Sequence, residues 1–198
     1  MTSTTASLPH TGGTPSDWVQ GWAHLVQPGG TVLDVACGHG RHSRFFAQRG
    51  HAVTAIDRNP DAIKAVADCA RTYCADIENG PYPLEAMGFD AVVVTNYLWR
   101  PLLPLILGNL AEGGVLIYET FAVGNETVGK PSRPDFLLQP GELLQVCAQG
   151  GLRVVAYQDG FLDAPERFVQ RVVAVRGLAD TAPLRLALRL GTTQGFRR

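Results

Sequence analysis

The sequence TVLDVACGHG occupies residues 31–40 and joins a run of apolar, largely β-branched residues to two closely spaced glycines. The apolar run predicts a buried strand over Thr31–Ala36, and the residues from Gly40 to Gln48 are typical of a helix. Gly38 and Gly40 allow the backbone to turn sharply and to approach a ligand that a Cβ atom would block. The stretch therefore predicts a strand, a glycine loop and a helix, whose N-terminus offers free N–H groups to an acidic ligand atom.

Strands and helices continue to alternate along the rest of the chain. Before the first strand, Asp17–Val26 has the spacing of a short helix. Further strands are expected over Ala52–Asp57, Tyr73–Asp76, Phe89–Thr95, Val115–Glu119, Leu152–Gln158 and Phe168–Val175, and further helices over Pro60–Cys69, Pro101–Ala111 and Pro140–Ala148. The last two strands are joined by about nine residues, too few for a helical crossover. We therefore expect an α/β fold with a doubly wound, mostly parallel seven-stranded sheet and a C-terminal antiparallel hairpin.

The length of 198 residues suits one domain of this kind. We expect a disordered leader over residues 1–14, a single domain over 15–176 and a basic tail over 177–198. The leader lacks the basic start and apolar centre of a signal peptide, and the four cysteines form no Cys-x-x-Cys pair. A reduced, cytoplasmic protein without a membrane segment is expected. The net charge of −1 predicts no general attraction to nucleic acid.

Three aspartates follow one another at the ends of successive predicted strands. Asp34 lies four residues before Gly38, where a dinucleotide-binding dehydrogenase usually has an apolar residue. The residues after Gly40 lack the third small residue of the dinucleotide fingerprint. Asp57 is placed to accept hydrogen bonds from ribose hydroxyls, and Asp76 is placed to meet an adenine amino group. The set favours an adenosyl ligand, and an NAD(P)-dependent oxidoreductase is the alternative.

The sequence VLDVACGHGRHSRFFAQRGHAVTAIDRNPDAI, residues 32–63, resembles the first two motifs of class I S-adenosylmethionine-dependent methyltransferases. GHGRHS at 38–43 and PGEL at 140–143 further resemble the tellurite-resistance-type branch of that family. The general resemblance covers roughly residues 32–175. This chain has Ala36 where the family usually has glycine, and its loop after the fifth strand departs from the narrower branch.

The resemblance implies S-adenosylmethionine as the cofactor and S-adenosylhomocysteine as the product. By position, Asp34 would lie near the methionine amino group, Asp57 at the ribose and Asp76 at the adenine. Asn96 and Tyr97 would lie near the methionine moiety and the transferring methyl group. The full set of expected cofactor-binding residues is Asp34, Ala36, Cys37, Gly38, Gly40, Asp57, Arg58, Ala75, Asp76, Ile77, Asn96 and Tyr97.

Methyl transfer from a sulfonium is an in-line displacement, so the protein mainly has to hold the donor and the acceptor in line. The long connection 121–139, together with residues 97–100 after the fourth strand, is expected to form the acceptor pocket and its cover. If the acceptor requires a general base, the candidates are Tyr97, Glu119 and His42. The residues expected on the acceptor side are Arg41, Trp99, Arg100, Lys130 and Arg133.

The expected reaction is methyl transfer to a small-molecule acceptor such as a thiol or an oxyanion, and the narrower resemblance suggests tellurite or another chalcogen oxyanion. A non-catalytic S-adenosylmethionine-binding protein is a further alternative. A nucleic-acid substrate is disfavoured because residues 95–98 read TNYL in place of an NPPY-like tetrad. No metal site is expected, since Cys37, His39 and His42 span a glycine turn without a fourth ligand nearby. The protein is expected to be a monomer or a homodimer.

Overall fold

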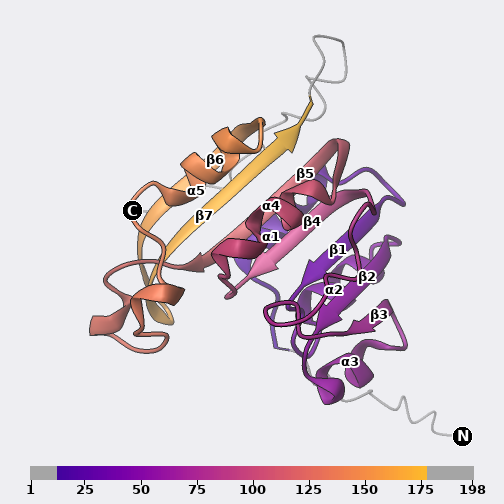
Figure 1. Ribbon diagram of the computed structural model, residues 1–198, viewed down its shortest axis with the longest axis horizontal. Coiled ribbons are helices and arrows are strands. Elements are labelled where there is room, and N and C mark those ends of the chain that lie inside the picture. Colours follow the sequence, from indigo (N-terminus) through magenta and orange to yellow (C-terminus); the bar gives the residue numbers. More distant parts are fainter. Residues whose placement is uncertain (1–12, 178–198) are drawn as a thin grey trace, which may run out of the picture.

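The computed structural model describes residues 13–177. Seven strands form one sheet in the order β3-β2-β1-β4-β5-β7-β6 (Figure 1). The strands β1 to β5 are parallel, and β7 runs antiparallel to both β5 and β6. The expected fold class is confirmed. The strands are β1 Thr31–Val35, β2 Ala52–Asp57, β3 Arg71–Cys74, β4 Phe89–Thr95, β5 Leu110–Phe121, β6 Leu152–Asp163 and β7 Glu166–Arg176.

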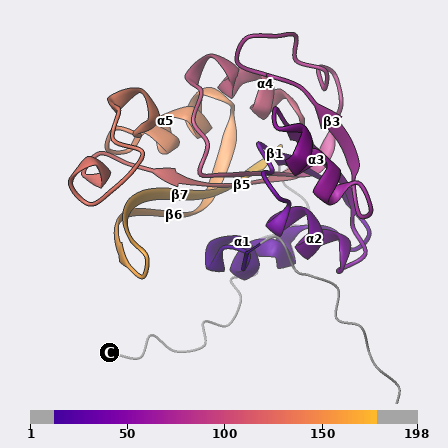
Figure 2. The same ribbon diagram turned by 90° about the horizontal axis from the view of Figure 1, so that it is seen from below.

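Helices cover both faces of the sheet. Figure 2 shows α4 and α5 on one side, and α1 and α2 on the other. The first pair encloses a core that includes Leu33, Ile106 and Leu143. The second pair encloses one that includes Trp18 and Phe46. The helices are α1 Asp17–Trp22, α2 Arg41–Ala47, α3 Pro60–Val66, α4 Leu103–Gly108 and α5 Glu142–Gln149, and short 3-10 turns span Ala23–Leu25, Arg100–Leu102, Asn125–Thr127 and Pro134–Phe136.

The central strand β4 explains why helices have to cover both faces of the sheet. Its sequence FDAVVVT is apolar at nearly every position, and its side chains are buried on both faces of the sheet. Such a run is typical of a parallel strand with helices above and below it. Because β1 pairs with β2 on one side and with β4 on the other, the strand order reverses at β1.

Several element boundaries differ from the sequence-based expectation; for example, the helix expected to reach Cys69 ends at Val66. The helix expected to reach Ala111 ends at Gly108, and β5 begins at Leu110. The two glycines at 113–114 do not separate the elements; Gly113 has a φ of +76°, and the β4–β5 register shifts between Phe89 and Ala91. Glycines thus form an irregularity inside the strand. The third expected strand also lies two residues earlier, so Asp76 follows β3 and does not end it.

The C-terminal hairpin is longer than expected. Strands β6 and β7 stay paired up to Asp163 and Glu166, and only Ala164 and Pro165 form the turn. The prediction of a nine-residue connection was therefore wrong, because cross-strand hydrogen bonds extend the ladder through polar residues whose composition favours a loop.

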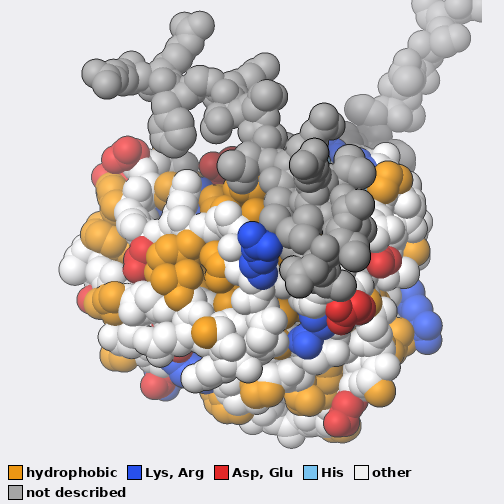
Figure 3. Space-filling model, turned by 90° about the horizontal axis from the view of Figure 1, so that it is seen from above, with side chains coloured by type: hydrophobic (Ala, Val, Ile, Leu, Met, Phe, Trp, Pro, Cys, Tyr) orange, Lys and Arg blue, Asp and Glu red, His pale blue; other side chains and the backbone are white. Residues whose placement is uncertain are grey.

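Most of the expected leader and tail, residues 1–12 and 178–198, lies outside the described residues. No helix within residues 13–177 combines the length and the apolar character that a membrane crossing requires. Figure 3 shows one face of the molecule, on which Lys and Arg side chains are scattered among Asp and Glu and form no continuous basic field.

Candidate functional site

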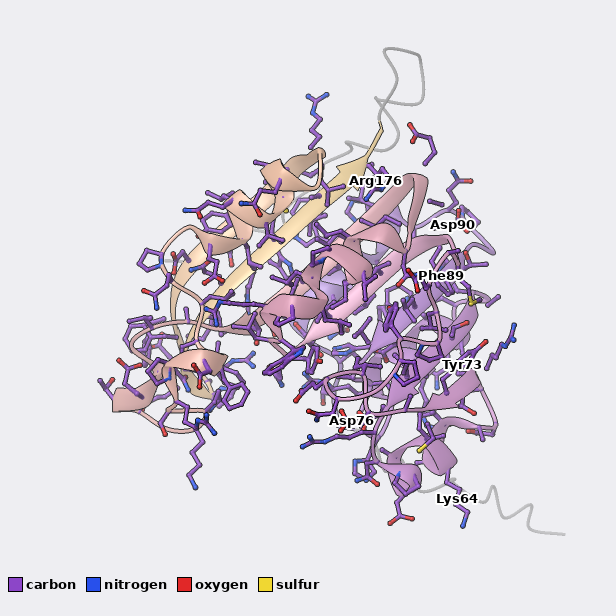
Figure 4. The ribbon with its side chains drawn as sticks, viewed as in Figure 1. Lys64, Tyr73, Asp76, Phe89, Asp90 and Arg176 are labelled. Atoms are coloured by element: carbon purple, nitrogen blue, oxygen red, sulfur yellow. The ribbon has the colours of Figure 1, made fainter. Side chains whose placement is uncertain are left out.

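The candidate site lies at the carboxyl ends of the parallel strands, where the strand order reverses. This is the position at which open α/β sheets bind ligands. Figure 4 shows Asp76 at this edge of the sheet, whereas Phe89 and Asp90, which begin β4, lie at the opposite edge together with Arg176. Residues that follow β1, β2, β3 and β4 therefore come together at one edge.

The glycine loop that follows β1 has a backbone that side chains rarely tolerate. Ala36, Gly38 and Gly40 all have positive φ angles, of 52°, 53° and 75°. A Cβ atom on Gly40 would lie 1.9 Å from Cγ1 of Val66 in α3, whereas one on Gly38 would meet no atom within 4 Å. Gly40 is thus required for packing, and Gly38 leaves open space above the loop.

Asp57 holds the glycine loop to the end of β2. Its Oδ2 atom accepts a hydrogen bond of 2.8 Å from the Gly38 N–H group, and its Oδ1 atom accepts one of 2.8 Å from the Asn59 N–H group. The carboxylate therefore fixes two backbone segments that face the site and still has lone pairs for ribose hydroxyls.

Two cavities meet at Ala36. The glycine-loop cavity, of about 340 Å³, is lined by Gly13, Ala36, Cys37, Gly38, His39, Arg41, Thr95 and Asn96. The Asp76 cavity, of about 130 Å³, is lined by Ala36, Asp57, Arg58, Ala75, Asp76, Ile77, Glu78 and Tyr97. Of the expected cofactor-binding residues, all except Asp34 and Gly40 line one of these two cavities.

Asp34 lies beneath the loop instead. It is 1% exposed, and its Oδ2 atom accepts a hydrogen bond of 2.6 Å from the Ser43 hydroxyl in α2. Burial raises the pKa of Asp34 to about 6, and the hydrogen bonds from Ser43 oppose that rise. Asp34 thus ties β1 to α2, and its contact with a methionine amino group stays a prediction.

A third cavity, of about 240 Å³, adjoins the other two. This Phe136 cavity shares Asn96 with the glycine-loop cavity, and Glu78 and Tyr97 with the Asp76 cavity. Burial raises the pKa of Tyr97, and the nearby Glu78 carboxylate adds to the effect. Its lining residues are Glu78, Asn96, Tyr97, Leu98, Thr120, Phe121, Pro131 and Phe136.

Two of the three candidate general bases, His42 and Glu119, are buried and bonded to other side chains or backbone groups of the protein. His42 is 2% exposed, and its Nε2 atom accepts a hydrogen bond of 3.0 Å from the Ser16 N–H group. The ring proton must then sit on Nδ1, which lies 3.3 Å from the Thr95 hydroxyl. Burial, with a contribution from Arg41, lowers the pKa of His42 to about 3. His42 is therefore a neutral structural side chain and is not placed as a general base.

Glu119 is likewise occupied. It is fully buried, and its Oε2 atom lies 2.6 Å from Nε of Arg171, while Oε1 lies 3.5 Å from Nη2 of Arg167. The Ser16 hydroxyl donates a further hydrogen bond of 3.2 Å to Oε2. Both carboxylate oxygens are therefore engaged with cationic side chains of β7. Of the three candidates, only Tyr97 lines a cavity.

The expected acceptor-side residues are dispersed. Arg41 lines the glycine-loop cavity, but Trp99 packs against the core, and Lys130 and Arg133 are exposed. Arg133 pairs with Asp135 and lies over the Phe136 ring at 5.3 Å without lining the cavity.

Arg100 has a structural role that the sequence did not predict. Its Nη1 and Nη2 atoms donate hydrogen bonds of 2.7 and 2.9 Å to the carbonyl oxygens of Asp135 and Leu137. Its Nε atom lies 2.7 Å from Oε1 of Glu142. Arg100 also lines a larger cavity of about 510 Å³ between α4 and α5, which contains none of the other residues expected to bind the cofactor or the acceptor. That cavity is not at the strand ends, so we place the site at the three connected cavities.

The long segment 121–139 is held closely to the domain. Leu138 donates to the Phe121 carbonyl and Val123 donates to the Leu138 carbonyl, both at 3.0 Å. The buried Asn125 donates to the Pro131 carbonyl at 3.0 Å and accepts from the Phe168 N–H group at 3.2 Å. The expected role of segment 121–139 as a cover of the acceptor pocket stays a prediction.

Sequence reasoning expected segments 97–100 and 121–139 to form the acceptor pocket, and these segments supply Tyr97, Leu98, Phe121, Pro131 and Phe136 of the Phe136 cavity, but it missed Glu78 and Thr120. It had singled out the charged residues of segment 121–139. The available signal was Phe121 and Phe136 near the two ends of that segment, since large apolar side chains are uncommon in a loop that is fully exposed to solvent. Within residues 13–177, no three His, Cys, Asp or Glu side chains gather as a metal ion would require.

Part of the chain is similar in sequence to known methyltransferases. Residues 32–113 match a family profile described as a methyltransferase domain. Among curated proteins, malonyl-[acyl-carrier protein] O-methyltransferase of Serratia marcescens is 36% identical over 107 residues, which are 50% of this chain and 41% of that protein. Ribosomal protein L11 methyltransferase of Burkholderia thailandensis is 38% identical over 88 residues, 43% of this chain and 28% of that protein. The chain thus spans less than half the length of these curated relatives.

Solved structures extend the likeness to most of the described chain. They include S-adenosylmethionine-dependent methyltransferases, and the expected resemblance to class I members of that family is confirmed in the fold and, over residues 32–113, in the match to the methyltransferase-domain profile. More particularly, TehB from Haemophilus influenzae matches with a TM-score of 0.64 and 21% identity, over 81% of this chain and 61% of that chain. A TehB-like methyltransferase from Corynebacterium glutamicum matches with a TM-score of 0.60 and 22% identity, over 80% of this chain and 86% of that chain. At these identities the likeness concerns the fold.

Proposed function

We propose that this protein is an S-adenosylmethionine-dependent methyltransferase that acts on a small-molecule acceptor. The observation that carries the proposal is the row of three connected cavities at the point where the strand order reverses. The Asp76 cavity and the glycine-loop cavity join at Ala36, and the Phe136 cavity opens beside Asn96 and Tyr97. An elongated donor and a separate acceptor can thus lie next to each other.

The chain's own residues suit an adenosyl donor. Asp76 and Ile77 line the deep cavity in which an adenine would lie, and Asp57 presents a carboxylate to the same cavity. Arg41 and the positive end of α2 lie at the glycine-loop cavity, where a donor carboxylate would find favourable charge. The residue set therefore offers a partner for the adenine, the ribose and the carboxylate of such a donor.

S-adenosylmethionine, when bound, supplies a methyl group whose bond to sulfur breaks with the electron pair left on sulfur, while an acceptor lone pair forms the new bond. The protein residues at the junction, Asn96 and Tyr97, position the two reactants in line and exclude water. No metal ion is needed for such a displacement.

Two structural relatives support a small acceptor. The 1,6-didemethyltoxoflavin-N1-methyltransferase of Burkholderia thailandensis was crystallised with its acceptor and S-adenosylhomocysteine. Coclaurine N-methyltransferase was crystallised with N-methylheliamine and the same product. Both share the fold of this chain, with TM-scores of 0.59 and 0.57.

A binding titration separates this proposal from the two alternatives. We expect calorimetry to give saturable binding of S-adenosylmethionine and S-adenosylhomocysteine and none of NAD or NADP. Asp57→Ala removes the acceptor of the Gly38 and Asn59 N–H groups and should weaken donor binding about tenfold or more. Asp163→Ala, at the exposed end of β6, is the matched control and should leave it unchanged.

Turnover distinguishes an enzyme from a binding protein. Release of S-adenosylhomocysteine with an added acceptor is the expected result. Preferential binding of NAD would sink the proposal in favour of an oxidoreductase, and donor binding without transfer to any acceptor would favour a non-catalytic binding protein.

A further inference from the structure

We propose that the methyl acceptor is a neutral or cationic molecule built on one ring or two fused rings, and that it binds in the Phe136 cavity. An oxyanion, which the narrower sequence resemblance suggests, does not fit this cavity. The inference rests on the proposed function, since it assigns the acceptor of the same reaction.

The lining of the cavity is mainly apolar. Leu98 comes from the segment after β4, Phe121 ends β5, and Pro131 and Phe136 come from segment 121–139. Flat aromatic rings favour offset or edge-on contact with another ring. An inorganic oxyanion would lose its hydration among these side chains and gain few hydrogen bonds in return.

The volume agrees with a ring-sized acceptor. A closed apolar cavity of about 150 Å³ is known to hold benzene. The Phe136 cavity measures about 240 Å³, which leaves room for one substituted ring or two fused rings. A three- or four-atom oxyanion would leave much of it unfilled.

The charge of the lining also favours a neutral or cationic acceptor, because Glu78 is the one charged side chain among residues 13–177 that lines the cavity. Several nearby cations are paired elsewhere: Arg100 with Glu142, Arg133 with Asp135, and the pair Arg167 and Arg171 with the buried Glu119. Arg58 lines the neighbouring Asp76 cavity, and the exposed Lys130 does not line the Phe136 cavity. Arg41 lines the neighbouring glycine-loop cavity. A carboxylate without a cation beside it in the cavity repels an anion and attracts a positive charge.

The same carboxylate suits the course of the reaction. A neutral nitrogen acceptor becomes positively charged as its lone pair bonds to the methyl group, and the donor sulfur becomes neutral. A nitrogen that carries a hydrogen then releases a proton to Glu78 or to water, whereas a pyridine-type nitrogen keeps the positive charge. A cationic amine must first lose a proton, to the same carboxylate or to water, before its lone pair can attack the methyl group. A carboxylate aimed at the developing charge stabilises that state more than the neutral reactant.

Polar side chains line the end of the Phe136 cavity that faces the proposed donor. Asn96 and Tyr97 line it where it joins the other two cavities. The Tyr97 hydroxyl is buried, and no group among the described residues satisfies it with good hydrogen-bond geometry. A heteroatom on an acceptor ring would fill that role, which would direct the nucleophile toward the donor.

The ring wall is held rigidly. Arg100 bonds the carbonyl oxygens of Asp135 and Leu137, the residues on either side of Phe136. A fixed aromatic wall selects acceptors by shape, because little ordering is needed when the ligand binds.

The test uses the full chain in the presence of S-adenosylhomocysteine for binding, and with S-adenosylmethionine for turnover. The ring probes are quinoline, which is neutral, and tyramine, which is cationic; the oxyanion probes are selenite and tellurite. We expect saturable binding of both ring probes. Phe136→Ala should weaken the binding of both ring probes about tenfold, because it removes one aromatic contact and the apolar area that this contact buries. Glu78→Gln should weaken tyramine binding more than quinoline binding.

Phe161→Ala is the matched control, because Phe161 lies on β6, is 42% exposed and lines none of the three cavities. It should leave ring binding unchanged, and Phe136→Ala should leave the donor Kd unchanged. The inference is overturned if the ring probes fail to bind, if Phe136→Ala does not affect them, or if selenite or tellurite is methylated in their place. Donor binding is measured separately, so its absence would count against the proposed function, whereas an oxyanion acceptor would leave that function standing.

Discussion

Arg100 and Glu142 form a two-point ion pair, with 2.7 Å between Nε and Oε1 and 2.9 Å between Nη2 and Oε2. Burial alone would raise the pKa of Glu142, but the hydrogen bonds from Arg100 and from the Gln139 N–H group outweigh it, so the pKa lies below its usual value. Because Arg100 also bonds the carbonyl groups beside Phe136, the start of α5 is coupled to the wall of the Phe136 cavity.

Replacement of Arg100 should therefore affect the acceptor and spare the donor. Arg100→Ala removes four hydrogen bonds and should lower the free energy of unfolding by about 1–3 kcal/mol. We expect the acceptor KM to rise about tenfold as Phe136 loses its support, with the donor Kd changed less than about twofold. Arg100→Lys should recover little, because an ammonium group cannot make the planar two-point contact. Steady-state kinetics and calorimetry provide both readouts.

Arg133→Ala is the control for that variant, since Arg133 also lies beside Phe136 but its ion pair with Asp135 is largely exposed. Exposed pairs contribute about 0–1 kcal/mol. Equal effects of Arg100→Ala and Arg133→Ala on the acceptor KM would contradict a specific positioning role for Arg100.

The two glycines of the loop should respond differently to alanine. At Gly40 a Cβ atom meets Val66 at 1.9 Å, so Gly40→Ala should cost about 2–4 kcal/mol of stability from backbone strain and overpacking. At Gly38 a Cβ atom meets nothing within 4 Å, so Gly38→Ala should cost only the strain of about 1 kcal/mol. Because Gly38 lines the glycine-loop cavity, this variant should weaken donor binding about tenfold.

A double-mutant cycle checks the origin of the Gly40 effect. In a Val66→Ala background the contact with Cγ1 is absent, so Gly40→Ala should cost little more than the strain. Chemical denaturation measures each corner of the cycle. Strictly additive losses would show that the contact with Val66 is not the cause.

The sequence was sufficient for the architecture because the signals for it are local. The apolar run of β4, the glycines after β1 and the proline that starts α3 each specify an element without reference to distant residues. The same holds for the loop residues around Asp57 and Asp76, which follow directly from strand ends. These are the residues that line the two cavities on the donor side.

The remaining features depend on contacts between distant residues. Arg100 looked like an acceptor-binding cation, yet its partners are 35 to 42 residues away and include two backbone carbonyl groups. His42 and Glu119 were candidate general bases by sequence. In the structure, Ser16 forms hydrogen bonds with both side chains, and two arginines of β7 form ion pairs with Glu119. Hairpin pairing likewise extended β6 through Asp159 and Gly160, against their composition. No local pattern encodes such partners.

His42 should influence stability and not the chemical step. Its pKa is lowered below the usual value of 6.5, so the folded protein prefers the neutral ring, and the unfolded chain binds a proton first as the pH falls. Its contribution to stability is therefore complete above pH 6.5 and is lost as the pH falls toward about 3. Between pH 6.5 and 5 this loss should amount to about 1–2 kcal/mol, and His42→Asn should remove that slope. A kcat profile whose limb near pH 6.5 vanishes in His42→Asn would instead assign His42 to catalysis.

Asp34 should show the opposite pH dependence. Its pKa is raised by burial from 3.8 to about 6, so the folded protein holds the proton more tightly than the unfolded chain does. Ionisation therefore costs stability, and the cost grows as the pH rises from about 4 through 6.

The variant Asp34→Asn tests this, because its side chain keeps an oxygen that can accept a hydrogen bond from Ser43 and carries no charge. Relative to wild type, its free energy of unfolding should rise by about 2 kcal/mol between pH 4.5 and 7.5. Urea denaturation at several pH values measures this, with the exposed Asp163→Asn as the flat control. A difference that stays constant with pH would show that Asp34 ionises at its ordinary pKa, and hence that water reaches it beneath the glycine loop.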